Sequence, residues 1–151
     1  QGLIVPKGNP RNITGLEDLS RDDITFINRQ RGSGTRILLD YKIKQGHMDS
    51  RKIKGYSREV FTHLAISAAV AGAQADVGLG IFSAAKAMDN DFVPVMKEQY
   101  DLVIPKIFYK DKLLEPLISI IHSQEFKNEV EALGGYDVST MGNIVTQRSN
   151  C

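Results

Sequence analysis

Polar and apolar positions alternate over short stretches of this chain and recur at helical spacing over longer ones. Short apolar runs bounded by Gly, Pro, Asn or Asp predict strands. Pro94 places one of these runs at the edge of a sheet, because proline cannot donate a hydrogen bond to a neighbouring strand. The predicted strands cover residues 3–5, 24–28, 75–81, 92–95 and 100–104.

Apolar residues spaced three and four apart predict helices. The helix at 57–71 is expected to begin at Ser57 as its N-cap and to end at Gly72, since these residue types favour those positions. Its small side chains would let it lie close to a sheet, and the strand at 75–81 follows it. This alternation of strand and helix predicts an α/β fold. The predicted helices cover residues 14–19, 35–45, 57–71, 83–88, 112–122 and 124–133.

Composition narrows the class of protein. At 151 residues and 42% apolar content the chain can form a real core, which argues against disorder. A formal net charge of +1 provides no global field for nucleic acid or an anionic membrane, so any anion affinity must be local. No apolar run approaches the roughly 18 residues of a membrane-spanning helix. The single cysteine, Cys151, excludes an internal disulfide and a multi-cysteine metal site.

The strongest local feature is a strand that runs through a glycine-containing loop into a helix. Such a helix start directs unpaired backbone N–H groups at one spot, where an anion can bind. Gly32 and Gly34 keep side chains away from that spot, and the Ser33 and Thr35 hydroxyls can donate to an oxyanion. The alternative is an ordinary helix start capped by Ser33. Positive charge comes from Arg29, Arg31 and Arg36.

A second helix start, around Tyr56, Ser57 and Thr62, could face the first one. The alternative is a capped surface helix with His63 satisfied locally. The first loop does not match the spacing of a nucleotide P-loop. Gly78 and Gly80 are interpreted as backbone clearance beside a cleft. No arrangement of Ser, His and Asp or of Cys and His indicates a catalytic nucleophile, and we predict no catalytic residue and no metal site.

Several segments together resemble the substrate-binding-like domains of the periplasmic-binding-protein superfamily, of the kind attached to molybdopterin biosynthesis proteins and to helix-turn-helix regulators. These domains are related to molybdate and tungstate binders. The resemblance covers roughly residues 3–142. It rests on Pro6-Lys7-Gly8-Asn9-Pro10, Phe26 to Arg36, Gly55-Tyr56 with Glu59 and Thr62-His63, Ala75 to Ile81, Phe92-Val93-Pro94, Glu98 to Leu102, and Gly134 to Asp137.

The resemblance implies one lobe of a two-lobe α/β domain, with a mixed, mostly parallel sheet of about five strands flanked by helices. Residues 1–106 would form the second lobe, including crossing strands at 3–6 and 102–105, and residues 107–151 a helical segment with an irregular tail. The chain would then be a piece of a longer protein that lacks most of the first lobe. The ligand contacts implied by the resemblance are Ser33, Gly34 and Thr35, with Arg31 or Arg36 as charge partner and Tyr56, Ser57 and Thr62 nearby.

The implied function is to bind a small oxyanion (molybdate, tungstate, sulfate or phosphate) in a protein of molybdenum-cofactor biosynthesis or sensing. Part of a molybdopterin molybdenumtransferase enzyme and a ligand-free scaffold lobe are the alternatives. Expected partners are the small anion, the first lobe, fused domains and a second copy in a homodimer, without direct nucleic acid contact. The expected compartment is the cytoplasm, with an extracytoplasmic binding protein as the alternative.

Overall fold

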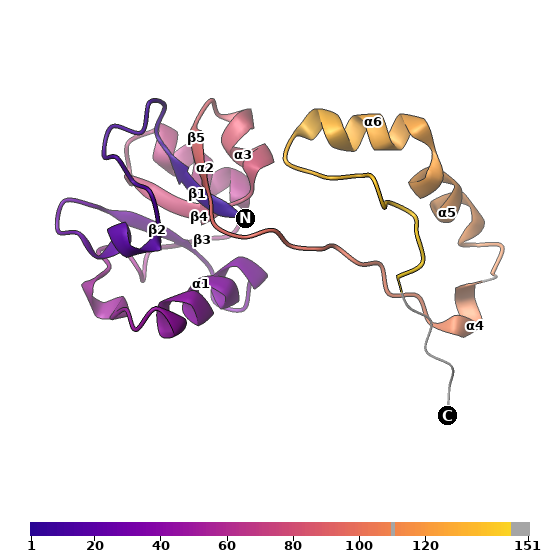
Figure 1. Ribbon diagram of the computed structural model, residues 1–151, viewed down its shortest axis with the longest axis horizontal. Helices are drawn as coiled ribbons and strands as arrows, with labels where there is room; N and C mark the ends of the chain where they lie inside the picture. The colour runs from indigo at the N-terminus through magenta and orange to yellow at the C-terminus, as the bar shows by residue number, and fades with distance from the viewer. Residues whose placement is uncertain (110, 146–151) are drawn as a thin grey trace. The chain divides into compact units, whose positions relative to one another are not determined.

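The computed structural model describes residues 1–109 and 111–145, and the end of the predicted tail with Cys151 lies outside them. The chain forms two compact units, the first covering Gln1–Glu98 and the second beginning at Gln99 (Figure 1). The first unit contains the sheet and the predicted site. In the described part of the chain, no helix is both long enough and apolar enough to span a membrane.

Five strands form one sheet in the first unit, in the order β3-β2-β4-β1-β5. β2 is parallel to β3 and to β4, whereas β1 lies antiparallel between β4 and β5. The sheet is therefore mixed and mostly parallel, as predicted, and β5 with Pro94 is an edge strand. The strands are β1 (Gly2–Val5), β2 (Phe26–Arg29), β3 (Glu59–Val60), β4 (Val77–Gly80) and β5 (Asp91–Pro94).

Helices cover both faces of this sheet (Figure 1). Side chains of successive strand residues point to opposite faces, so Phe26 packs with Leu39 of α1 while Ile27 packs with Ile66 of α2. The core accordingly has two layers, one on each side of a central sheet. The helices of this unit are α1 (Gly34–Gln45), α2 (His63–Ala71) and α3 (Phe82–Ala87), with 3₁₀ turns at Leu16–Ser20 and Ser50–Lys52.

The second unit contains only helices and irregular chain among its described residues. Ser123 caps α6 by accepting a hydrogen bond from the Phe126 N–H. Residues 100–104, predicted as a strand, form none, because no strand of the described chain lies beside them to accept their hydrogen bonds. Crossing of the chain to another lobe at residues 3–6 and 102–105 stays a prediction. The helices are α4 (Lys106–Tyr109), α5 (Glu115–His122) and α6 (Gln124–Leu133).

The helix predicted from Ser57 is shorter than its pattern indicated. α2 begins at His63, and its N-cap is Thr62, whose hydroxyl accepts from the Ala65 N–H at 3.0 Å. The preceding residues instead form β3, where Glu59 pairs with Asn28 of β2. Pairing with a strand 31 residues earlier in the chain outweighed the local helical preference, and a single-sequence pattern cannot reveal such pairing.

A glycine turn positions β3 against β2, and it supplies a testable prediction. Gly55 has a φ of +88°, and a Cβ there would collide with the Phe26 carbonyl oxygen. Gly55→Ala should therefore lower the free energy of unfolding by about 3 kcal/mol, combining left-handed strain with overpacking. Gly8→Ala is the matched control, because Gly8 also has a positive φ, +77°, but no neighbour within 4 Å. Urea unfolding that shows equal losses for the two variants would contradict the role of the collision.

Candidate functional site

The parallel strands β2, β3 and β4 end at one edge of the sheet, which we call the carboxyl edge. Each of them leads directly into a helix, so the helices α1, α2 and α3 all begin at this edge. α1 packs on one face and α2 on the other, so the chain turns to opposite faces after β2 and β3. In open α/β sheets such a reversal leaves a crevice outside the strand ends, where ligands bind.

The start of α1 presents free backbone donors at this edge. The Arg36 and Ile37 N–H groups bind the Ser33 hydroxyl and the Ser33 carbonyl. The N–H groups of Gly34 and Thr35 have no acceptor within the described residues. A bound anion can accept from both, and the helix dipole favours negative charge at the same place.

Two hydroxyls lie beside these amides. Ser33 Oγ accepts from the Arg36 N–H at 3.2 Å, as an N-cap does, which leaves its own proton free to donate. Thr35 is buried, at 3% exposed, yet its hydroxyl forms no hydrogen bond to the described chain. That hydroxyl is also absent from the fully enclosed atoms that lack a partner, so it retains access to the surface. The Ser33 cap is therefore compatible with free donors at the start of α1.

Arg29, the last residue of β2, supplies a buried positive charge. It is 9% exposed, and its guanidinium donates to the Phe61 carbonyl just before α2 at 3.0 Å and to the Gln30 side chain at 3.1 Å. Among the described residues it forms no ion pair with a carboxylate. Burial lowers the pKa of Arg29, which shows that its charge is poorly solvated. An anion at the carboxyl edge would compensate it.

Arg36, in contrast, already has its charge compensated. Its guanidinium contacts Asp40 at 2.9 Å and Glu59 at 3.0 Å, and its side chain is 4% exposed. The Tyr56 ring lies against it, with the ring centroid 4.3 Å from the guanidinium carbon, and the Tyr56 hydroxyl donates to Asp40 at 2.6 Å. Glu59 also accepts from the Arg31 N–H at 3.3 Å. This network ties the glycine loop to β3 and to the start of α1.

The remaining predicted site residues divide into exposed and capping positions. The Arg31 side chain is 87% exposed and reaches no closer than 3.9 Å to Glu59. Ser57 is exposed and makes no hydrogen bond within the described chain. Thr62 caps α2 and lies beside Phe61, whose carbonyl Arg29 holds. The structure thus brings Thr62 to the carboxyl edge together with Ser33, Gly34 and Thr35.

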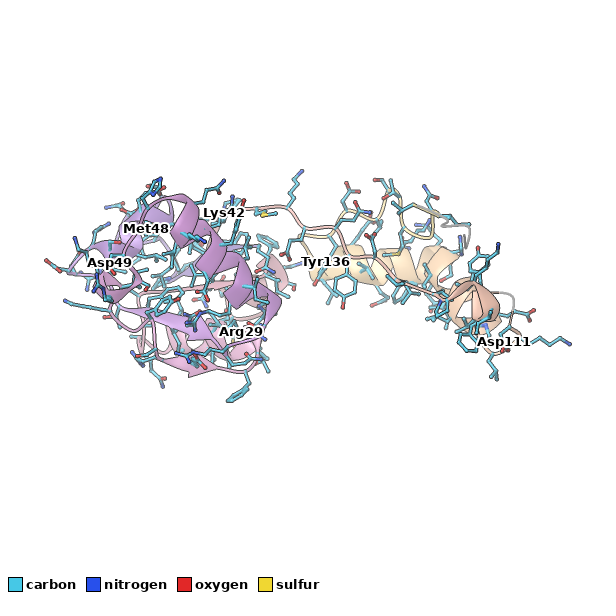
Figure 2. All side chains as sticks on the ribbon, turned by 90° about the horizontal axis from the view of Figure 1, so that it is seen from below. Arg29, Lys42, Met48, Asp49, Asp111 and Tyr136 are labelled. Atoms are coloured by element: carbon cyan, nitrogen blue, oxygen red, sulfur yellow. The ribbon has the colours of Figure 1, made fainter. Side chains whose placement is uncertain are left out.

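Arg29 was expected from the sequence only as a source of local positive charge. The alternation of side chains along a strand could have shown which face of the sheet Arg29 lies on. β2 alternates faces, so Arg29 lies on the same face as Ile27, which α2 covers. In Figure 2 Arg29 lies toward one end of α1, opposite Met48 and Asp49, which follow the C-terminal end of that helix. Arg29 therefore lies at the carboxyl edge, on the face of the sheet that α2 covers.

Gly78 and Asp76 have structural roles. The absence of a side chain at Gly78 makes room for helix α2 and not for a ligand, because a Cβ there would lie 2.5 Å from the Ile66 side chain. Asp76 accepts from the Thr25 N–H at 2.8 Å and pairs with Arg11, as a structural residue at a strand start does. Among the described residues, no group of three or more acidic, His or Cys side chains could hold a metal ion.

Comparison with known proteins places this chain in a family. An uncharacterized protein, YvgK of Bacillus subtilis, is 38% identical over 146 residues, which are 97% of this chain and 47% of that protein. An uncharacterized protein from the region 5′ of a 2Fe-2S ferredoxin gene of Clostridium pasteurianum is 45% identical over 112 residues, 74% of this chain and 99% of that protein. The chain therefore spans about half the length of the first relative. No solved structure matches.

The domain model of the PBP superfamily matches residues 1–122, which include the sheet, the glycine loop and the starts of all three sheet-flanking helices. The mixed α/β sheet flanked by helices agrees with that match. The chain belongs to the PBP superfamily of periplasmic-binding-protein-like domains.

Proposed function

We propose that this chain is a binding module for a small oxyanion, held at the carboxyl edge of the sheet. The observation that carries the proposal is the pairing of two free amides, on Gly34 and Thr35, with a buried arginine, Arg29, that has no carboxylate partner. Amides and hydroxyls supply oriented donors, and Arg29 supplies the charge. In this proposal Arg36 organises the loop and does not contact the ligand, because Asp40 and Glu59 already bind it.

This set of donors would accept molybdate, tungstate, sulfate or phosphate, since each presents several oxygens to the same groups. The family resemblance makes molybdate and tungstate the first anions to test. In a two-lobe protein a second lobe would close over the anion and exclude water, which strengthens each hydrogen bond to it. We therefore expect the single chain to bind more weakly than a form with both lobes.

The proposal is tested by removing both hydroxyls beside the amides. Ser33→Ala combined with Thr35→Ala should reduce anion affinity by about 10- to 100-fold, because each neutral hydrogen bond contributes about 0.5–1.5 kcal/mol. Calorimetric titration with molybdate, tungstate, sulfate and phosphate measures this loss. Ser123→Ala is the matched control, since it also removes a helix N-cap but lies in the second unit. Unchanged affinity in the double variant would exclude this site.

A role in molybdenum-cofactor biosynthesis or in sensing is proposed from the family resemblance. A molybdopterin-binding domain in the same reading frame would support delivery of the oxyanion to an enzyme, and a helix-turn-helix domain would support sensing. The module itself needs no catalytic residue for either role, because holding and releasing the anion would suffice.

A further inference from the structure

Two buried polar atoms at the carboxyl edge lack a hydrogen-bond partner. They are Nδ1 of His63 and Oε1 of Gln1, and no other enclosed side-chain N or O in the described residues is without one. His63 is the first residue of α2, and its Nδ1 lies 3.5 Å from where a Cβ of Gly80, at the end of β4, would stand. Gln1 precedes Gly2, which pairs with Gly80. Nδ1 of His63 therefore lies beside the end of β4, and Gln1 precedes the strand residue that pairs with that end.

The chemistry of these two atoms determines which hydrogen-bond partner each of them can take. The Gln1 amide nitrogen donates to Glu98 at 2.6 Å, so its oxygen can only accept a hydrogen bond. Burial, and secondly the positive charge of Arg29, lower the pKa of His63 to about 4, so its ring is neutral at neutral pH. A neutral imidazole has one nitrogen that accepts. The edge thus offers unused acceptors as well as the donors of α1 and Arg29.

We propose that the ligand carries a hydrogen-bond donor in addition to its negative charge, and that His63 selects it by accepting that hydrogen bond through Nδ1. This inference rests on the proposed anion site and narrows its ligand class. The acceptor role is assigned to Nδ1 because Nδ1 is the enclosed ring nitrogen without a partner, and a neutral ring can carry its proton on Nε2. Buried polar groups are normally satisfied, and a donor on a ligand at this edge would satisfy Nδ1 of His63.

The ligand class that fits this proposal is an anion that bears a hydroxyl group. Hydrogenphosphate has one on a tetrahedral centre, and a small hydroxycarboxylate such as glycolate has one beside its carboxylate. Sulfate, molybdate and acetate are the matched anions that present acceptors alone at neutral pH. A site that hydrogen-bonds a ligand hydroxyl rejects an analogue without it, because the site's own polar group is then left unpaired.

The test compares matched anions on the whole chain by calorimetric titration at neutral pH. We expect phosphate to bind at least about tenfold more tightly than sulfate, or glycolate at least about tenfold more tightly than acetate. The first preference would indicate a tetrahedral ligand and the second a hydroxycarboxylate. His63→Phe keeps a ring of similar size without the nitrogens, and it should reduce the preference to within about twofold, because the ring no longer accepts a hydrogen bond from the ligand.

The outcomes separate this inference from the proposed function. Sulfate or molybdate binding as tightly as phosphate, with acetate equal to glycolate, would overturn the inference and leave the anion site standing. A preference that persists in His63→Phe would overturn the selecting role of His63. Absence of binding by every one of these anions would overturn the proposed function and this inference with it. The comparison in the unaltered chain decides the ligand class even if His63→Phe fails to fold.

Discussion

Arg29→Gln is expected to weaken anion binding by about 100-fold, because it removes a buried charge at the carboxyl edge that no carboxylate of the described residues compensates. Glutamine retains hydrogen-bonding atoms near the Phe61 carbonyl, so the loss isolates the charge more cleanly than truncation would. Arg29→Lys should recover only part of the affinity, since an ammonium keeps the charge without the planar fork of donors. Titration calorimetry measures both effects.

Arg31→Gln is the matched control for this prediction. Arg31 lies two residues after Arg29, carries the same charge, and has a side chain that is 87% exposed. Solvent screens such a charge, so its removal should change anion affinity by less than about threefold. Equal losses in the two variants would mean that only the general positive charge of the loop matters. The assignment of Arg29 to the ligand would then be wrong.

The part of the fold that sequence could predict is the part that local pattern determines. Apolar runs gave β1, β2, β4 and β5 to within a few residues, and the helical spacing gave α1 and α6. β3 escaped prediction because it has two residues and depends on β2 for its hydrogen bonds. The run at 100–104 has strand-like alternation but no partner strand in the described chain, so pattern alone overstated it.

The candidate site likewise has a part that the sequence could predict and a part that it could not. The donors at the start of α1 could be predicted, because a strand, a glycine loop and a serine cap in sequence define a helix start. The contrast between Arg29 and Arg36 could not be predicted, since it depends on Glu59, which β3 brings alongside, and on Asp40 one turn further along α1. The unpartnered nitrogen of His63 depends likewise on the three-dimensional packing of α2 against β4. Charge compensation and burial are tertiary properties, and they decide which arginine is available to a ligand.

Phe26→Ala is expected to have the largest effect on stability, lowering the free energy of unfolding by about 3–5 kcal/mol. Phe26 begins β2, is fully buried, and packs in the layer between the sheet and α1. Its removal leaves a cavity at the strand on which the glycine loop depends. Chemical denaturation should show a lower midpoint with an unchanged slope.

Phe61→Ala tests whether this loss comes from burial and not from the residue type. Phe61 is 75% exposed at the residue before the cap of α2, so its truncation should change the free energy of unfolding by less than about 0.5 kcal/mol. The two substitutions remove the same atoms from opposite environments. A similar loss in both would contradict the two-layer core and indicate that Phe61 is covered in solution. A difference of several kcal/mol would instead establish that β2 is anchored through Phe26, which holds Arg29 in place three residues further along the same strand.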